Sequence, residues 1–203
     1  QSLAPAEQLG YVGAQAKNLF ALGWSVRRNG QIEASLPLFE QAYALALQVG
    51  DLRLQSGILN ALGSLHQTRG ELARAADCRQ RAYELRVQLN DALGIHLYLY
   101  DQGDTLFQHG RWDEALLVFE QAYAKAVEAG GYREIARVLT NIGIVYKSQG
   151  RYAQATEVFE QALEFSECIQ FPPVLVFTLH ALAETYVTMN DLETAQTYYL
   201  QAL

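Results

Sequence analysis

The sequence predicts an all-α fold, a solenoid of about five antiparallel helix hairpins. The main observation is a spacing of 40 residues, which joins Gly30, Gly70, Gly110 and Gly150 and leads to Asn190 in the fifth place. A second observation is the segment Phe-Glu-Gln-Ala, which stands at residues 39–42, 119–122 and 159–162. Repetition with a period of roughly 20–50 residues is typical of solenoids. The composition agrees, because Ala, Leu and Gln are abundant and only 4 of the 203 residues are proline.

The first helix of each unit is clearest in the fourth repeat. There the apolar residues keep helical spacing at Ile135, Val138, Leu139, Ile142 and Tyr146. Gly150 then ends the helix, because glycine adopts the left-handed conformation after a helix without a Cβ penalty, and Asn is its usual substitute. We therefore predict first helices near 12–29, 52–69, 92–109, 132–149 and 174–189.

The second helices are predicted near 31–49, 71–89, 111–129, 151–168 and from 191 to the end. The turns that follow them are marked by Gly50-Asp51, Asn90-Asp91, Gly130-Gly131 and Pro172-Pro173. Asp51 and Asp91 are placed to cap the next helix with their carboxylates. Pro37 falls about six positions into the first of these helices. Either that helix begins late, with Ser35 as its cap, or it kinks at Pro37.

Both ends of the chain cut the repeat pattern. Ala6, Gln8 and Gly10 match Ala46, Gln48 and Gly50, so residues 1–10 are predicted to be the tail of a preceding second helix. Residues 197–203 stop within a helix, without the polar cap that the end of a solenoid needs. We expect a fragment of a longer protein, or an end covered by a partner such as a second copy.

Composition excludes several classes of function. The chain has 15 basic and 22 acidic residues and a net charge of −7, which argues against nucleic-acid binding. No apolar run has the roughly 18–20 residues of a membrane span, and the N-terminus has no signal-peptide pattern. Its 2 cysteines stand at non-equivalent points of their repeats and do not form a disulfide framework. We expect a cytoplasmic protein that binds neither membrane nor nucleic acid.

The repeat resembles the tetratricopeptide repeat family, in a 40-residue variant similar to those of kinesin light chains, Pins-type scaffold proteins and bacterial signalling regulators. The fourth repeat carries the motif on Leu139, Ile142, Gly143, Tyr146, Gly150, Ala155, Phe159 and Ala162. The resemblance implies a right-handed superhelix that forms one domain over residues 1–203. Its repeats would span approximately 12–50, 51–90, 91–130, 131–170 and 171–203.

The resemblance also implies a concave groove lined by the first helices. Carried over by register, the site candidates in this groove are Lys17, Phe20, Trp24, Arg27, Asn60, Tyr100, Asp104, Arg137, Asn141, Lys147, His180 and Glu184. The same register also gives the groove positions Arg28, Ser64, Gln67, His96, Asp101, Phe107, Thr140, Ile144, Phe177 and Val187. Exposed aromatic and arginine side chains are typical of binding hot spots. The Lys/Asn arrangement with which some members clamp a C-terminal carboxylate is absent, because Phe20 and Trp24 occupy its positions.

The second repeat departs from the pattern, with His66 and Arg79 where large rings are expected. Either the Arg79 stem packs while its head reaches water, or the hairpin holds a functional polar pocket. The choice between these two is left open by the sequence.

The sequence favours a non-catalytic scaffold that binds a peptide or partner helix in the groove. The alternative is a regulatory, dimerisation or peptide-sensor module of a larger signalling protein, with a homodimer formed through an exposed end. His96, Tyr100 and Asp104 stand four apart on one helical face, as a metal or proton-transfer site could require. No HExxH, CxxC or phosphate-loop motif accompanies them, so we expect no enzyme, no metal and no cofactor.

Overall fold

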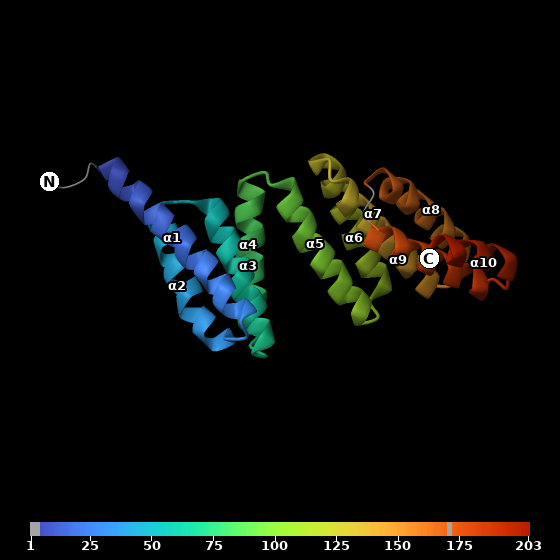
Figure 1. The fold of residues 1–203 in the computed structure, drawn as a ribbon, viewed down its shortest axis with the longest axis horizontal. Coiled ribbons are helices and arrows are strands. Elements are labelled where there is room, and N and C mark those ends of the chain that lie inside the picture. The colour runs from blue at the N-terminus through green and yellow to red at the C-terminus, as the bar shows by residue number, and fades with distance from the viewer. Residues whose placement is uncertain (1–4, 170–171) are drawn as a thin grey trace. The chain divides into compact units, whose positions relative to one another are not determined.

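A computed structural model of the chain describes residues 5–169 and 172–203, and these form ten α-helices and no strand (Figure 1). The helices divide into two compact units, residues 1–91 (unit 1) and 92–203 (unit 2). Unit 1 holds α1 (Pro5–Arg28), α2 (Ile32–Gln48), α3 (Leu52–Thr68) and α4 (Leu72–Gln88). Unit 2 holds α5 (Ala92–Gln108), α6 (Trp112–Ala129), α7 (Tyr132–Ser148), α8 (Tyr152–Ile169), α9 (Pro172–Thr188) and α10 (Leu192–Gln201).

Consecutive helices pair as hairpins, and the hairpins stack on one another within each unit. In unit 1, α1 packs on α2 and α3 packs on α4, and the two hairpins contact each other where α2 packs on α3. In unit 2, α6 joins α7 and α8 joins α9, and the first helices α5, α7 and α9 also contact in succession. This confirms the all-α solenoid of helix hairpins. That all five repeats form a single domain stays a prediction.

The predicted turns take the backbone conformation that glycine favours. Gly30, Gly70, Gly110 and Gly150 have φ between 74° and 80°, and Asn190 has φ 63°. The turns between hairpins do the same at Gly50, Asn90 and Gly130, so that a left-handed residue recurs every 20 residues through most of the chain. Asp51 caps α3 as predicted, because its carboxylate accepts from the Leu54 amide at 2.9 Å.

In the first repeat, one expectation is wrong and one of the two alternatives at Pro37 is excluded. The chain does not break at Gly10, since α1 runs without interruption from Pro5 to Arg28 and Gly10 has no positive φ. Glycine permits a turn without imposing one, and a glycine inside a helix costs only about 1 kcal/mol. Residues 1–4 of the predicted tail lie outside the described residues.

The helix that contains Pro37 does not begin late either. It begins at Ile32 and continues through Pro37. Ser35 is buried and its hydroxyl donates to the Ile32 carbonyl at 2.6 Å, so it does not serve as the cap.

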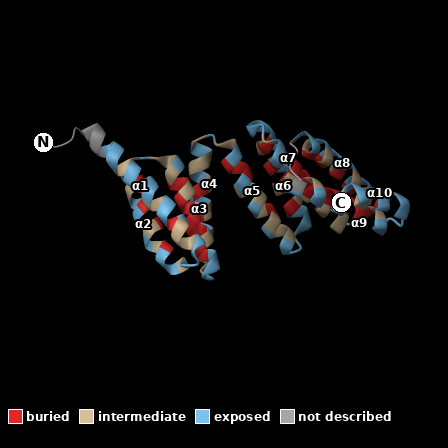
Figure 2. Ribbon diagram, viewed as in Figure 1, coloured by how far each residue is buried: buried red, intermediate tan, exposed pale blue. Residues whose placement is uncertain are grey.

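In three hairpins, a buried phenylalanine of the second helix packs against a glycine of the first helix. Phe39, Phe119 and Phe159 are almost wholly buried, and a Cβ built on Gly23, Gly103 or Gly143 would lie 2.5–2.6 Å from the facing ring. The buried residues gather where helices face one another (Figure 2). Glycine at these positions therefore sets how closely the two helices approach. Among the described residues, no helix combines the length and apolar character needed to cross a membrane.

Candidate functional site

A cavity of about 430 Å³ opens in unit 2 between the first helices of its hairpins. We call it the Tyr100 cavity, and it is lined by Tyr100 of α5, by Arg133, Arg137, Thr140 and Asn141 of α7, and by Pro173, Val174 and Phe177 of α9. Three helices that are consecutive first helices in the chain thus contribute to one site.

Two polar side chains of α7 contact the tyrosine that lines this cavity. The Arg137 guanidinium carbon lies 4.5 Å from the centre of the Tyr100 ring. Asn141 donates from its amide nitrogen to the Tyr100 hydroxyl at 3.0 Å. On its other side the ring packs edge-on against Phe119, with centroids 5.9 Å apart. A cation over a ring face and a satisfied hydroxyl both fix the ring, so α5 presents Tyr100 in one orientation.

The α9 side of the cavity is apolar. Val174 is buried, while Phe177 is 55% exposed and its ring is open to solvent. Thr140 and Thr178 join α7 to α9 beneath it, with their hydroxyl oxygens 2.8 Å apart and both side chains buried. The cavity therefore has basic and amide groups on one side and an apolar wall on the other.

A second cavity, of about 340 Å³, follows along α7 and α9 on the other side of Phe177. We call it the Lys147 cavity, lined by Ile144, Lys147, Ser148, Tyr152, Phe177, His180, Ala181, Glu184 and Thr188. Lys147 and Glu184 form an ion pair of 2.7 Å across it. Its charged groups therefore balance one another.

The predicted groove residues of unit 1 are partly used for packing. Phe20 and Trp24 each lie 5.8 Å, centroid to centroid, from the buried ring of Phe39. Arg27 stacks over Trp24 at 5.2 Å and donates to the Ser64 hydroxyl at 2.9 Å. These side chains belong as much to the packing of unit 1 as to its surface. Of the other two site candidates in this unit, Lys17 is exposed and Asn60 half-buried.

The His96, Tyr100 and Asp104 side chains do not share one environment in the structure. His96 is fully buried, and its Nδ1 donates to the Ala122 carbonyl at 2.9 Å while its Nε2 is buried without a partner. Asp104 accepts from Gln108 at 2.7 Å and does not line the Tyr100 cavity. In the described part of the chain, no three His, Cys, Asp or Glu side chains gather as a metal site would need.

Sequence reasoning missed seven cavity residues, namely Arg133, Pro173, Val174, Ser148, Ala181, Thr188 and Tyr152. The first three lie in the opening turns of α7 and α9, one turn before the register positions. Extending the register by one turn toward the N-terminus of each first helix would have found them. Tyr152 belongs to a second helix, which the groove register leaves out.

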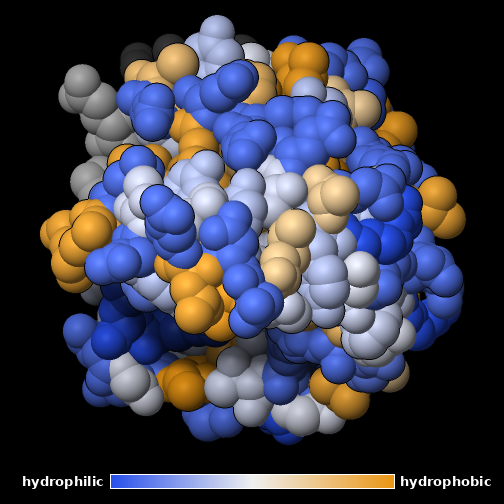
Figure 3. Space-filling view, turned by 90° about the vertical axis from the view of Figure 1, so that its right-hand side faces the viewer, coloured by the Kyte–Doolittle hydropathy of each residue, from blue (hydrophilic) through white to orange (hydrophobic). Residues whose placement is uncertain are grey.

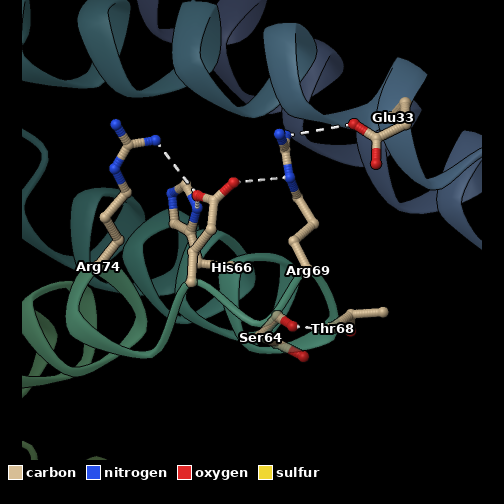
Figure 4. Close-up of polar contacts among 7 residues, drawn as sticks. Glu33, Ser64, His66, Thr68, Arg69 and Arg74 are labelled. Carbon is tan, nitrogen blue, oxygen red and sulfur yellow. Dashed lines mark hydrogen bonds and ion pairs between the residues drawn. The ribbon is translucent and has the colours of Figure 1, made fainter.

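The polar residues of the second repeat form a network in unit 1 around Glu71 (Figure 4). His66 donates to the Glu71 carboxylate at 2.7 Å, and Arg69 and Arg74 reach the same carboxylate at 3.0 and 3.2 Å. Arg69 also extends to Glu33 of α2 at 3.2 Å. The hydrogen bond from His66, helped by the two arginines and opposed by partial burial, holds the pKa of Glu71 below its ordinary value of 4.5.

Arg79 takes the place of the core phenylalanine in this repeat. A Cβ built on Gly63 would lie 3.2 Å from the Cγ of Arg79, and the Arg79 head donates to Gln67. The stem therefore packs and the head reaches the exposed side chain of Gln67, which agrees with the first of the two interpretations. A functional role of the polar residues in this hairpin stays a hypothesis.

Comparison with known proteins identifies the repeats. Models of the tetratricopeptide repeat family match residues 100–167 and 178–203. Among curated protein sequences, none matches the chain.

Several solved structures share the fold. A Podosopora anserina protein, described as a kinesin light chain with nearly identical TPR-like repeats, is 16% identical, with 94% of this chain and 93% of that one covered and a TM-score of 0.67. Aspartyl phosphate phosphatase F from Bacillus subtilis is 16% identical over 93% of this chain and 49% of its own, with a TM-score of 0.76. A signal transduction ATPase with a tetratricopeptide repeat sensor, from Pyrococcus horikoshii, is 18% identical over 96% of this chain and 30% of its own, with a TM-score of 0.75.

This chain thus spans about half of the phosphatase and less than a third of the ATPase. At these identities the likeness shows the fold, and the family models supply the family. The two matched ranges fall in unit 2, and the same 40-residue pattern of glycine, alanine and large apolar residues continues through unit 1. The repeats at residues 100–167 and 178–203 belong to the tetratricopeptide repeat family, and the repeat pattern of unit 1 resembles them.

Proposed function

We propose that the chain is a non-catalytic protein-interaction module, and that α5, α7 and α9 of unit 2 bind a peptide or partner helix. The observation that carries the proposal is the row of two cavities along these helices, which share the exposed ring of Phe177. Pockets with an apolar lining and a few converging polar groups are the usual form of binding sites. The cavities are lined by nine residues that the register assigns to the groove, namely Tyr100, Arg137, Thr140, Asn141, Ile144, Lys147, Phe177, His180 and Glu184.

Site-specific crosslinking tests this proposal. A photoreactive benzoylphenylalanine at position 177 should crosslink a partner, which mass spectrometry identifies and which is then purified and tested. The matched control carries the same group at Leu117 of α6, which is 60% exposed but lies on a second helix. Crosslinking of the purified partner at 117 and not at 177 would place the binding surface elsewhere.

Self-association through the last hairpin is a second candidate. A cavity of about 390 Å³ lies between α9 and α10, and Val187, Leu192 and Leu200 at its rim are 45–63% exposed. At the end of the molecule that Figure 3 shows, however, apolar side chains lie as separate spots among hydrophilic ones. Stable dimer interfaces have a continuous apolar centre, so we rank this candidate second. Sedimentation decides it, because a dimer that dissociates when Leu200 is changed to Glu would favour it over the groove.

A further inference from the structure

The Tyr100 cavity differs in charge from the chain that surrounds it. Its charged lining residues are Arg133 and Arg137, and no acidic side chain lines it. The chain as a whole carries a net charge of −7. A basic cavity in an acidic protein attracts an anionic group locally while the rest of the surface repels it.

Arg137 is the residue of this cavity whose charge is left uncompensated. Arg133 pairs with Glu134 at 2.8 Å, and Lys147 in the next cavity pairs with Glu184 at 2.7 Å. The guanidinium of Arg137 instead lies on the Tyr100 ring, and within the described residues no carboxylate is within ion-pair distance of it. Stacking uses the face of a guanidinium and leaves the N–H groups at its edge free for a bidentate carboxylate.

The groups beside Arg137 suit a peptide rather than a small free acid. One N–H of the Asn141 side chain donates to the Tyr100 hydroxyl, and the side-chain carbonyl oxygen can accept a hydrogen bond from a backbone amide of a ligand. Val174 and Phe177 provide an apolar wall on the opposite side of the cavity. A ligand that uses all three features has a carboxylate, a backbone amide and an apolar side chain close together.

We infer that the Tyr100 cavity binds a peptide segment in which an acidic residue stands next to a large apolar one. The carboxylate pairs with Arg137, the backbone reaches Asn141, and the apolar side chain lies against Phe177. This inference rests on the proposed function, because it names the chemistry of the partner that the first helices of unit 2 would bind.

Selection of peptides on the whole chain tests the inference. Phage-displayed random 12-residue peptides are selected on residues 1–203, and the peptides obtained are measured against Arg137→Gln. The matched control is Arg151→Gln, since Arg151 also stacks on a tyrosine, Tyr146, at 4.4 Å but lies outside the cavity. Circular dichroism checks that each variant keeps its helices.

The selected peptides should carry Asp or Glu within one residue of Phe, Leu, Ile or Trp. Arg137→Gln should weaken their binding about tenfold, the usual size of a lost charge-assisted hydrogen bond, and Arg151→Gln should leave it unchanged. Peptides whose acid is changed to the amide should bind the wild-type chain and Arg137→Gln equally.

Two other outcomes are separable. Peptides that depend on Phe177 but not on an acid or on Arg137 would overturn this inference and leave the proposed function standing. Peptides that bind Phe177→Asp as tightly as the wild type, or no selectable peptide at all, would overturn both.

Discussion

At the scale of single residues, the core position of the second helix holds phenylalanine in three hairpins and arginine in the second hairpin. In all four, the side chain packs against a glycine of the first helix. Three hairpins set a phenylalanine on a helix glycine, and the second hairpin sets the aliphatic stem of Arg79 on Gly63. An arginine stem can cover apolar surface while its head stays wet. The nearby His66, Arg69 and Arg74 all meet the Glu71 carboxylate, so the second repeat replaces part of its aromatic core by a polar network.

This network predicts a pH dependence of stability. The pKa of Glu71 is lowered in the folded chain, first by its hydrogen bond with His66. The Glu71 carboxylate therefore stabilises the fold at pH values above its ordinary pKa of 4.5, and this contribution is lost as the pH falls below 4.5 through the lowered folded value.

Urea denaturation between pH 7 and pH 3 measures the effect. The free energy of unfolding of Glu71→Gln should be lower than that of the wild type at pH 7, and the difference should shrink as the pH falls below 4.5. A difference that is constant across this range would contradict the assignment.

At the scale of helices, the distance between the two helices of a hairpin depends on one glycine. In the fourth repeat, a Cβ on Gly143 of α7 would come within 2.5 Å of the Phe159 ring of α8. Gly57 of α3 is also helical, but a Cβ there would stand 3.8 Å from Phe20, an ordinary contact. A substitution at Gly143 changes both the packing of a hairpin and the helix propensity, whereas a substitution at Gly57 changes the helix propensity alone.

The same substitution at these two glycines should act with opposite sign. Gly143→Ala should destabilise the chain by about 1–3 kcal/mol through overpacking, while Gly57→Ala should stabilise it by about 0.5–1 kcal/mol because alanine favours the helix. Chemical denaturation followed by circular dichroism measures both. If Gly143→Ala proved as stabilising as Gly57→Ala, the close packing of Phe159 on α7 would be wrong.

At the scale of the whole molecule, both described cavities of the proposed groove belong to unit 2. Residues 92–203 hold three hairpins with their own core and contacts. Repeat proteins are stabilised mainly by contacts between neighbouring repeats, so a unit of three hairpins has most of what it needs to fold.

We therefore expect residues 92–203, expressed alone, to be helical, to unfold cooperatively and to bind the same peptides as the whole chain. Circular dichroism and peptide titration are the measurements. Residues 1–91 serve as the comparison and should not bind these peptides. A fragment 92–203 that folds but has lost peptide binding would show that the site needs unit 1.

The sequence by itself determined the helices, the turns and the repeat register, because each depends on residues close together in the chain. A left-handed glycine or asparagine follows eight of the described helices, from Gly30 to Asn190, and Asp51 caps α3 through an amide three residues away. Where one local signal stood alone, as at Gly10, it misled, since a glycine can also continue a helix.

Only the tertiary structure decided which predicted groove residues meet and what they form. Tyr100, Arg137 and Phe177 come from three repeats, and whether they enclose a cavity depends on side-chain volumes on three helices at once. The register alone assigned Trp24 to the groove together with these residues. In the structure, however, part of the Trp24 ring packs against the core residue Phe39. In the tertiary structure the Arg137 guanidinium stacks on the Tyr100 ring and forms no ion pair with a carboxylate of the described residues, because its neighbours on α5 and α9 are aromatic and apolar. Spacing along the chain does not report such neighbours, since they are 37 to 40 residues away in sequence.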